Sequence, residues 1–570
     1  MSYKNFKTAI YCTTHDIMNI SSLKTFSEQM DNILKHMHID KMYLDTVRSE
    51  EMVDESKIRG IRQYYESRGI KTAGGITLNA LFNGDFKSFC YSEQEYIDKV
   101  KKIITFTADL FDEIILDDFF FTNCKCENCI SKKGDRSWTD FRLSQHEVVS
   151  RIILDTAKNI NPNINMIIKY PNWYEDYQTT GYNLEKSSQI FDETYTGTEV
   201  RDSKHTQQNL QPYLSYFLMR YLENVKPGKN GGGWFDTLDC VYNPNRFIEQ
   251  INLTLLSKAK EATVFSLGSL LYDHDLFIPI AGHVYKKMDN VLGKLGECTG
   301  ISCYKPYHSQ GEDYLHNFIG MIGLPLEPKP YFDTSSKTIL LTESSSYDDV
   351  LMAKAKKHLI NGNNIIVTSG LIKKLSSDDC CSIHELIEID YSDKKILVDT
   401  IAYKKDVCSY SNYERINKNI LLPQLKYSTN DVWEEVCGIS EELSYPILLK
   451  AQYGSETIFI LTVPDNFSDL YLIPQGAINY MRDLFMDDFK IKLHCPAKIS
   501  LFLYNNNTFS IQSFLNHKSY VDVVIEGENK TVTDIITNKE VTGINIKNET
   551  HIKMLMDARQ NKIFKLAKSN

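Results

Sequence analysis

Residues 113–129 read EIILDDFFFTNCKCENC. The apolar run at 114–116 is typical of a strand buried in a parallel sheet, and it ends in two adjacent carboxylates, Asp117 and Asp118. Three cysteines with C-x-C-x-x-C spacing follow at once. The first half predicts a strand that carries acid–base groups to the mouth of a site. The second half predicts a metal site on the loop that leaves this strand.

Apolar, β-rich runs of this kind recur through the first half of the chain and alternate with amphipathic segments such as 93–110 and 146–159. This alternation predicts a parallel sheet covered by helices, and eight such units match a closed (β/α)₈ barrel. A doubly wound open sheet is the alternative, but the sequence offers no G-x-G-x-x-G turn for a dinucleotide site. The eight runs are 8–12, 42–45, 71–76, 113–117, 165–170, 189–193, 233–236 and 262–266.

The sequence pattern predicts three domains. Residues 1–300 form the catalytic barrel. In residues 301–425 a β-α-β pattern indicates a flavodoxin-like or amidotransferase-like α/β domain with a possible role in oligomerisation. In residues 426–570 short alternating runs separated by turn signals predict an antiparallel β-sandwich.

Composition limits the class of protein. The 570 residues are 42% hydrophobic and 24% charged, as in ordinary soluble globular proteins. The net charge of −10 argues against a nucleic-acid partner or an anionic membrane surface. We find no apolar run of about 20 residues that would span a bilayer and no signal peptide. Thirteen cysteines without a secreted disulfide pattern suit a reducing compartment, so we expect a cytoplasmic protein.

The cysteine triplet predicts a structural zinc site. Cys124, Cys126 and Cys129 supply three soft ligands, and tetrahedral zinc requires a fourth. Cys90 is the best candidate, because it precedes the helix that leads into the fourth strand. Four thiolates leave no open coordination position, so the ion would order the loop rather than take part in chemistry. The alternative is three free thiols on a loop. We expect no organic cofactor.

Acidic residues at strand ends predict glycosidic-bond hydrolysis, which usually needs two carboxyl groups on either side of the bond. The strand ends of a barrel bring such groups together at one face. Asp118 on the fourth strand and Glu193 on the sixth are the predicted pair, with Asp117, Glu199 and Asp236 in reserve. Each could instead be a solvated loop carboxylate or a helix N-cap.

Further side chains are predicted to line the same face and bind substrate. Lys169 would hold a substrate hydroxyl or carboxylate, or would only neutralise Asp118. Aromatic side chains past the strand ends could stack on a pyranose ring or simply pack. The predicted substrate-binding residues are His15, Asp45, Lys169, Tyr170, Trp173, Glu199, Arg201 and Trp234.

With these features the chain resembles glycoside hydrolase family 42, the β-galactosidase family. The resemblance implies a catalytic (β/α)₈ barrel, an amidotransferase-like trimerisation domain and a small C-terminal β domain. The upstream cysteine and the C-x-C-x-x-C triplet match the zinc cluster that members often carry. The family uses an Asn-Glu pair at strand four and a Glu at strand seven, whereas this chain offers Asp117-Asp118 and Asp236. An Asp on strand four with a partner on strand six is more similar to α-galactosidase-type barrels.

The resemblance therefore implies the fold, the zinc and a homo-oligomer, trimer or dimer, but not β-galactosidase activity. We expect an exo-acting glycoside hydrolase that acts on oligosaccharides. One alternative is a non-catalytic carbohydrate-binding protein on a glycosidase-like barrel. Another is a barrel isomerase or lyase that uses Lys169 and the carboxylates.

Overall fold

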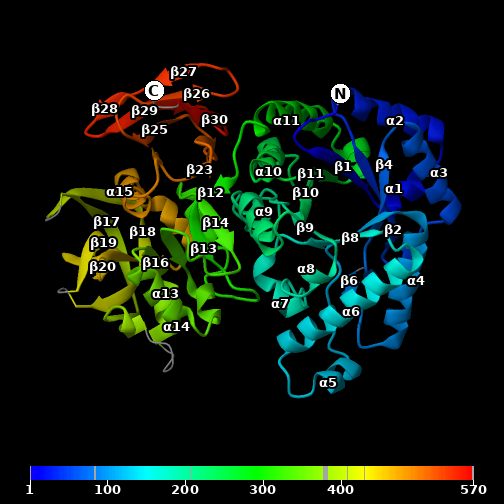
Figure 1. Cartoon of the computed structure of the whole chain (residues 1–570), viewed down its shortest axis with the longest axis horizontal. Helices are drawn as coiled ribbons and strands as arrows, with labels where there is room; N and C mark the ends of the chain where they lie inside the picture. The colour runs from blue at the N-terminus through cyan, green and yellow to red at the C-terminus, as the bar shows by residue number, and fades with distance from the viewer. Residues whose placement is uncertain are drawn as a thin grey trace. The chain divides into compact units, whose positions relative to one another are not determined.

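The computed structural model describes residues 2–82, 85–206, 208–376, 383–406, 409–428 and 431–567. The chain divides into two compact units, Met1–Gly293 and Lys294–Asn570, which are described separately below (Figure 1).

The first unit is a closed barrel of eight parallel strands. The sheet runs β1-β11-β10-β9-β8-β7-β4-β2, and pairing of β1 with β2 closes it. The predicted (β/α)₈ fold is confirmed. The barrel strands are β1 (Lys7–Cys12), β2 (Lys41–Arg48), β4 (Lys71–Ile76), β7 (Glu113–Leu116), β8 (Asn165–Tyr170), β9 (Glu193–Gly197), β10 (Asn230–Asp236) and β11 (Glu261–Phe265).

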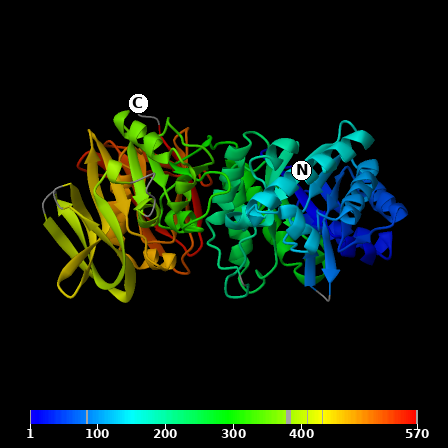
Figure 2. The ribbon, with the colours of Figure 1, turned by 90° about the horizontal axis from the view of Figure 1, so that it is seen from below.

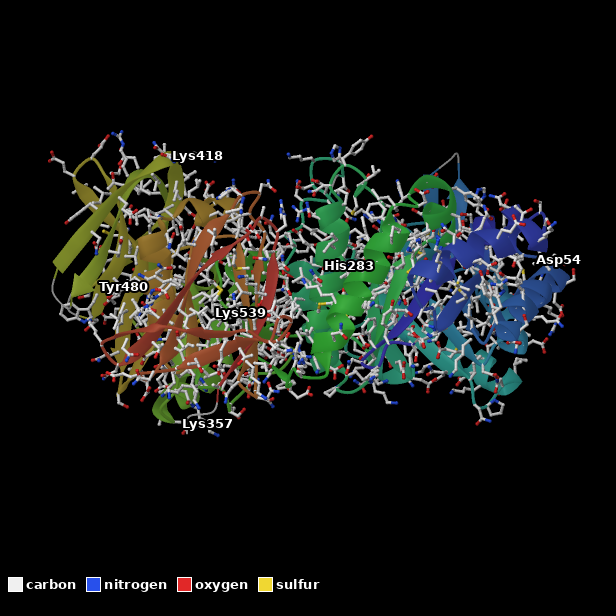
Figure 3. The ribbon with its side chains drawn as sticks, turned by 90° about the horizontal axis from the view of Figure 1, so that it is seen from above. Asp54, His283, Lys357, Lys418, Tyr480 and Lys539 are labelled. Atoms are coloured by element: carbon white, nitrogen blue, oxygen red, sulfur yellow. The ribbon has the colours of Figure 1, made fainter. Side chains whose placement is uncertain are left out.

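Helices surround these strands (Figure 1). Several of them bury one apolar stripe, whereas α9 is buried along most of its length. In α3 the apolar Ile58, Ile61 and Tyr65 are buried. Asp54, labelled in Figure 3, is the N-cap of this helix, and its carboxylate accepts the N–H groups of Ser56 and Lys57. The helices are α1 (Thr14–Asn19), α2 (Leu23–His36), α3 (Glu55–Ser67), α4 (Gln94–Leu110), α5 (Glu127–Lys133), α6 (Trp138–Ile160), α7 (Tyr177–Thr180), α8 (Ser187–Ile190), α9 (Leu214–Val225), α10 (Pro244–Leu256) and α11 (Phe277–Leu292). Short strands β3 (Glu51–Met52), β5 (Asn79–Phe82) and β6 (Asp85–Ser88) lie in the loops.

Large side chains fill the barrel interior. Tyr11 occupies so much of it that a Cβ at Gly75 would lie 2.4 Å from the Tyr11 hydroxyl, so only glycine fits there. Because side chains alternate along a strand, the residues two positions beyond this layer also face the barrel axis, toward the carboxyl ends of the strands. The buried layer consists of Ala9, Tyr11, Tyr43, Ala73, Ile115, Ile167, Tyr195 and Trp234.

The sixth barrel strand differs from the prediction. Residues 187–190 form the short helix α8, and the strand begins at Glu193 and ends at Gly197. Its β-branched Thr194 and Thr196 suit a strand better than the run before Glu193 does. The predicted placement of Glu193 at the carboxyl end of this strand is therefore wrong.

The second unit begins with a mixed sheet in the order β14-β13-β15-β16-β21-β20-β19-β17-β18. The first five strands are parallel and are accompanied by α12 (Leu315–Met321), α13 (Leu351–Ile360) and α14 (Ser369–Ser376). The remaining strands form an antiparallel extension, shown in yellow tones in Figure 2. The strands are β13 (Ile301–Tyr304), β14 (Leu326–Lys329), β15 (Thr338–Leu341), β16 (Asn364–Thr368), β17 (Ile389–Asp406), β18 (Ser409–Tyr427), β19 (Val432–Ser440), β20 (Leu443–Tyr453) and β21 (Glu456–Leu461).

This sheet continues past residue 425, where the sequence places a domain boundary. Ile458 and Phe459 of β21 pair in parallel with Ile365 and Ile366 of β16. The run at 457–461, which the sequence assigns to the C-terminal sandwich, is therefore a buried strand of the α/β sheet.

The strands after helix α15 (Gln475–Phe485) form two antiparallel sheets, one of which also includes β12 from the start of this unit. One has the order β12-β23-β24-β30-β26-β27 and the other β22-β25-β29-β28. These strands are β12 (Cys298–Thr299), β22 (Ile491–His494), β23 (Ile499–Tyr504), β24 (Thr508–Ser513), β25 (Ser519–Glu526), β26 (Thr531–Asp534), β27 (Glu540–Thr542), β28 (Ile544–Ile546), β29 (Glu549–Met556) and β30 (Asn561–Leu566). Within the described ranges, no helix has the length and apolar character to cross a membrane.

Candidate active site

A cavity of about 770 Å³ lies at the carboxyl ends of the barrel strands. Acidic, basic and aromatic side chains line it together, which is the composition of a small-molecule site. The lining residues are Arg48, Asp117, Asp118, Phe119, Phe121, Lys169, Asn172, Trp173, Asp176, Thr179, Thr180, Glu199, Arg201, Gln208, Trp234, Asp236, Leu238 and Phe265.

Lys169 is the centre of the charged network. Its Nζ lies 2.7 Å from Asp118 Oδ2, 2.9 Å from Glu199 Oε1 and 3.4 Å from Asp117 Oδ1. It also lies 4.3 Å from the centre of the Trp234 ring, on the cavity floor. Lys169 is 2% exposed, and burial alone would lower its pKa, but the three carboxylates overcome that effect and raise it. Lys169 is therefore a fixed ammonium ion.

Asp117 is held by a second cation. Arg48 contacts Asp45 through Nε at 2.7 Å and Asp117 through Nη2 at 2.8 Å. Burial opposes ionisation of Asp117, but Lys169 and Arg48 outweigh it, so the pKa of Asp117 lies below its usual value. Asp117 faces the barrel axis as a permanent anion.

Asp236, the last residue of β10, is held mainly by Arg201, with a smaller contribution from the Leu238 backbone N–H. Arg201 Nη2 lies 2.6 Å from Asp236 Oδ2, and Nε lies 3.1 Å from the same oxygen. Asp236 is 1% exposed, and its burial raises its pKa although the guanidinium opposes this.

The network contains more carboxyl groups than cations. Some of its carboxyl groups therefore have raised pKa values and are easily protonated. Burial raises the pKa of Asp118 to about 6, reinforced by Asp117 and Glu199 and opposed by Lys169. Burial also raises the pKa of Glu199 and that of Asp45, the latter to about 6. Asp118 differs from the others because its side chain is 24% exposed and lies at the cavity surface. It is the carboxyl group best placed to exchange a proton with a ligand.

Aromatic side chains form one wall of the cavity. The Phe121 ring packs edge-on against Trp173, with centroids 5.9 Å apart, and Phe119 lies 6.1 Å from Phe121. All three are only partly buried. Such exposed ring faces suit the apolar face of a pyranose ring.

Most of the predicted site residues lie together. Asp117, Asp118, Lys169, Trp173, Glu199, Arg201, Trp234 and Asp236 line the cavity, and Asp45 supports Arg48 behind it. Three do not lie there. Glu193 is the first residue of β9, at the opposite end of the barrel, where it pairs with Ile167. His15 is exposed on α1 and contacts Asn19, and Tyr170 is buried against Tyr177 and Tyr182.

Sequence analysis missed Arg48, Asn172, Phe119, Phe121 and Gln208. Arg48 could have been found, because it ends the second strand just as Asp236 ends the seventh. Asn172 and Gln208 come from irregular loops, where spacing carries no signal.

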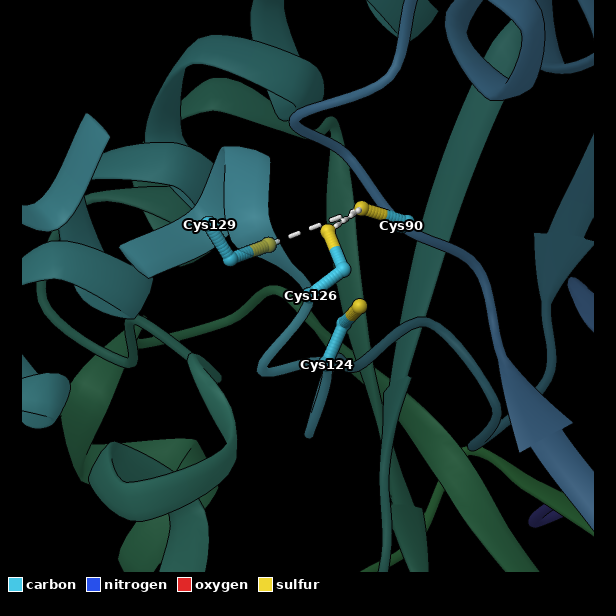
Figure 4. A group of neighbouring side chains, drawn as sticks. All are labelled: Cys90, Cys124, Cys126 and Cys129. Carbon is cyan, nitrogen blue, oxygen red and sulfur yellow. Dashed lines mark hydrogen bonds between the residues drawn. The ribbon is translucent and has the colours of Figure 1, made fainter. Parts of the chain in front are cut away.

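The four predicted metal ligands gather in one cluster beside the site (Figure 4). Cys90 Sγ lies 3.6 Å from Cys126 Sγ and 3.5 Å from Cys129 Sγ. All four sulfur atoms, including that of Cys124, lie within 4.8 Å of one another. Sulfur ligands about 2.3 Å from a tetrahedral zinc ion would be nearly this far apart, so the donor set and spacing fit.

The cysteine loop is fixed to the cavity wall by hydrogen bonds. The Thr122 N–H donates to the Thr180 carbonyl at 2.9 Å, and Arg142 donates to the carbonyls of Thr179 and Asn123. Thr179 and Thr180 line the cavity. A metal ion in the cluster would therefore stabilise the segment that carries Asp118 and the aromatic wall.

Comparisons with known proteins agree with this geometry. Residues 1–279 match the family model "Probable glycosyl hydrolase, catalytic domain". Residues 296–466 match "Uncharacterized protein SSO3021, second domain", and residues 490–567 match "Probable glycosyl hydrolase, C-terminal domain". An uncharacterised protein of Saccharolobus solfataricus is 24% identical over 541 residues, which cover 86% of this chain and 87% of that protein.

Solved structures share the whole fold. Gan42B, a GH42 β-galactosidase from G. stearothermophilus, superposes with a TM-score of 0.67 at 11% identity, covering 100% of this chain and 99% of that one. An α-L-fucosidase isoenzyme from Paenibacillus thiaminolyticus gives a TM-score of 0.67 at 11% identity, with full coverage of both chains. The barrel thus matches the catalytic domain of probable glycosyl hydrolases.

The chain shares its fold with the family 42 β-galactosidases, and residues 1–279 and 490–567 match models of probable glycosyl hydrolases. The predicted resemblance to family 42 is confirmed at the level of the fold.

Proposed function

We propose that this protein hydrolyses glycosidic bonds, with Asp118 and Glu199 as the working carboxyl groups. The main observation behind the proposal is that both side chains line the cavity and contact the same ammonium group, that of Lys169. The match of residues 1–279 to a glycosyl hydrolase catalytic domain supports it. Glu199 replaces Glu193 as the acid of the sixth strand.

The separation of the two acids favours retention of configuration. Asp118 Oδ2 and Glu199 Oε1 lie 2.7 and 2.9 Å from the same nitrogen, so these oxygens are at most 5.6 Å apart. Retaining enzymes hold their carboxyl groups about 5–5.5 Å apart, and inverting enzymes about 6.5–9.5 Å.

Asp118 is the proposed proton donor. Its raised pKa lets it carry a proton in mildly acidic solution, and it gives that proton to the leaving oxygen as the Glu199 carboxylate bonds to the anomeric carbon. Asp118 then removes a proton from water, which attacks the anomeric carbon and frees Glu199. Burial raises the pKa of Glu199, and Lys169 opposes this rise, so the ammonium favours the ionised carboxylate before the attack.

The substrate we propose is an uncharged oligosaccharide cut from its end. The cavity volume of about 770 Å³ suits a small ligand. The excess of carboxyl groups over cations disfavours an acidic sugar. The similar structures act on different sugars by their titles, a β-galactosidase, an α-L-fucosidase and an exo-β-1,4-mannosidase, so they do not select one.

The state of Lys169 argues against the isomerase or lyase alternative. An enzyme of that kind would need this lysine as a neutral base or nucleophile. Three carboxylates instead keep it protonated, and its pKa is raised rather than lowered.

A panel of aryl glycosides tests whether the protein hydrolyses glycosidic bonds and whether Glu199 is the second catalytic carboxyl group. We expect turnover of one or more glycosides, and a loss of about 10²–10⁴-fold in Glu199→Gln. Azide should restore turnover in Glu199→Gln if Glu199 is the nucleophile, and should not in Asp236→Asn. Rescue of Asp236→Asn alone would move the nucleophile to the seventh strand. Binding of sugars without turnover of any glycoside would favour the carbohydrate-binding alternative.

We also propose that the four cysteines hold a structural zinc ion. Removing it with a chelator, or replacing Cys126 by Ser, should lower the melting temperature and loosen the segment between Asp118 and Cys124. Proteolysis of this segment and metal analysis check the result. Cys298→Ser, at a half-buried cysteine outside the cluster, is treated alike as the control and should melt as wild type does. Unchanged melting after complete metal removal would contradict the role.

The remaining proposals concern the cellular compartment and the oligomeric state of the protein. We propose that it works in the cytoplasm, as the cysteine usage suggests, and that the second unit supports a homo-oligomer, a trimer or a dimer.

A further inference from the structure

Two histidines and an aspartate form a cluster in the C-terminal part of the second unit, far along the chain from the cysteines. His494 ends β22, Asp522 lies in β25 and His551 lies in β29. Their possible ligand atoms all lie within 4.8 Å of one another. These are the types of donor that bind zinc and other divalent transition metals.

The strand register places all three on one face of the sheet. His494 lies directly opposite Asp522, and Asp522 lies opposite Lys553, two residues beyond His551. Side chains opposite each other and two residues apart share a face. The opposite face carries buried Val521 and Val523, so the cluster is separate from that core.

The cluster contains an unused acceptor. Asp522 Oδ2 contacts His551 Nδ1 at 2.9 Å, whereas Asp522 Oδ1 is buried and has no hydrogen-bond partner. A buried carboxylate oxygen without a partner is costly, and a metal ion would satisfy it.

A fourth side chain orients one of the histidines. Asp483 of α15 lies 2.8 Å and 3.0 Å, through its two oxygens, from His494 Nε2 (Figure 1 labels α15, β25 and β29). A carboxylate bound to one ring nitrogen fixes the proton there and leaves the other nitrogen free to bind a metal, as is usual for metal-ligating histidines.

We propose that His494, Asp522 and His551 form a second metal site, selective for zinc or a similar divalent ion, with Asp483 orienting His494. The three side chains are 23%, 16% and 10% exposed, so water can reach the site and complete the coordination. Zinc bonds of about 2.0–2.2 Å require the ligands to move together by about 1.5 Å at most. The ion would fasten α15 and three strands to one another.

Metal content of the full chain, loaded with Zn²⁺ and desalted, tests the site. We expect His551→Gln, His494→Gln and Asp522→Asn to hold one zinc ion fewer per chain than wild type. Asp483→Asn, which removes the orienting carboxylate, should bind the ion about 10–100-fold more weakly. His517→Gln is the matched control, because His517 is exposed in the same part of the chain. It should keep the wild-type content.

All these variants keep the four cysteines, so any zinc bound there contributes equally to each measured zinc content. Differences in zinc content between the variants therefore report on the histidine site. Equal zinc content in His551→Gln, His494→Gln and His517→Gln would overturn the proposal and leave the cluster as an ion-pair network. If His551→Gln fails to fold, His494→Gln, at the end of its strand, decides the question.

Discussion

Replacing Asp118 by Asn should lower glycoside turnover by about 10²–10⁴-fold, the usual contribution of a general acid–base group, while the chain stays folded. The amide has nearly the same shape, but it cannot give a proton to the leaving oxygen. The loss should therefore be larger for aryl leaving groups of high pKa than for activated nitrophenolates, which depart without a proton.

The pH profile gives an independent readout of the same prediction. Because the pKa of Asp118 is raised to about 6, the wild-type rate should fall as the pH rises above about 6, where the acid loses its proton. Asp118→Asn should lack this limb. Steady-state rates on two leaving groups across this pH range check both effects.

Asp176→Asn is the matched control for Asp118→Asn, because Asp176 also lines the cavity but is exposed at its edge. It should keep turnover within a few-fold of wild type. An Asp118→Asn enzyme with a wild-type rate and pH profile would remove Asp118 from the proposed mechanism.

The barrel could be predicted from the sequence because each buried strand is a continuous apolar, β-rich run that can be recognised without knowing its partners. Seven of the eight runs coincide with strands to within a few residues, as at 71–76 and 165–170. The sixth failed because Ile190 and Phe191 are typical strand residues but lie at the end of the short helix α8, which packs against α6. The β-branched and aromatic run Thr194-Tyr195-Thr196 predicts the true strand. A strand placed there would have made Glu199, rather than Glu193, the predicted acid at its carboxyl end.

The cysteine cluster was predictable for a different reason. Three ligands lie within six residues, and only Cys90 had to be brought in by folding. By contrast, the extent of the mixed sheet depends on the pairing of β21 with β16, about ninety residues apart, which no local pattern specifies. The same limit applies to Arg48 and Asp117, whose contact at 2.8 Å joins two separate strands.

Replacing Lys169 by Met should have the largest effect on stability of any single change at the site. Methionine fills much of the same volume, but it leaves Asp117, Asp118 and Glu199 without their shared cation. Removing one partner of a buried ion pair costs about 3–5 kcal/mol, because the remaining charge stays buried and uncompensated. Denaturant unfolding near pH 8 should show a loss of this size.

The loss should shrink as the pH falls toward 5. Without the ammonium, the pKa values of Asp118 and Glu199 rise further above their unfolded values, and the lowered pKa of Asp117 rises as well. The folded variant therefore binds more protons than the unfolded chain. Its stability is therefore retained at low pH and lost as the pH rises through the raised values. Lys99→Met is the control, because Lys99 also contacts two carboxylates but is 39% exposed, and it should lose less than about 1 kcal/mol.

A second substitution separates charge burial from lost packing. If buried charge causes the loss, adding Glu199→Gln to Lys169→Met should recover part of the stability, because one uncompensated anion is removed. The two changes would then be less than additive, with a coupling of about 0.5–3 kcal/mol. Strict additivity, or a Lys169→Met loss that does not vary with pH, would mean that Lys169 acts mainly through packing against Trp234. The carboxyl groups would then not depend on it for their ionisation, and the proposed role of Lys169 in keeping Glu199 anionic would fail.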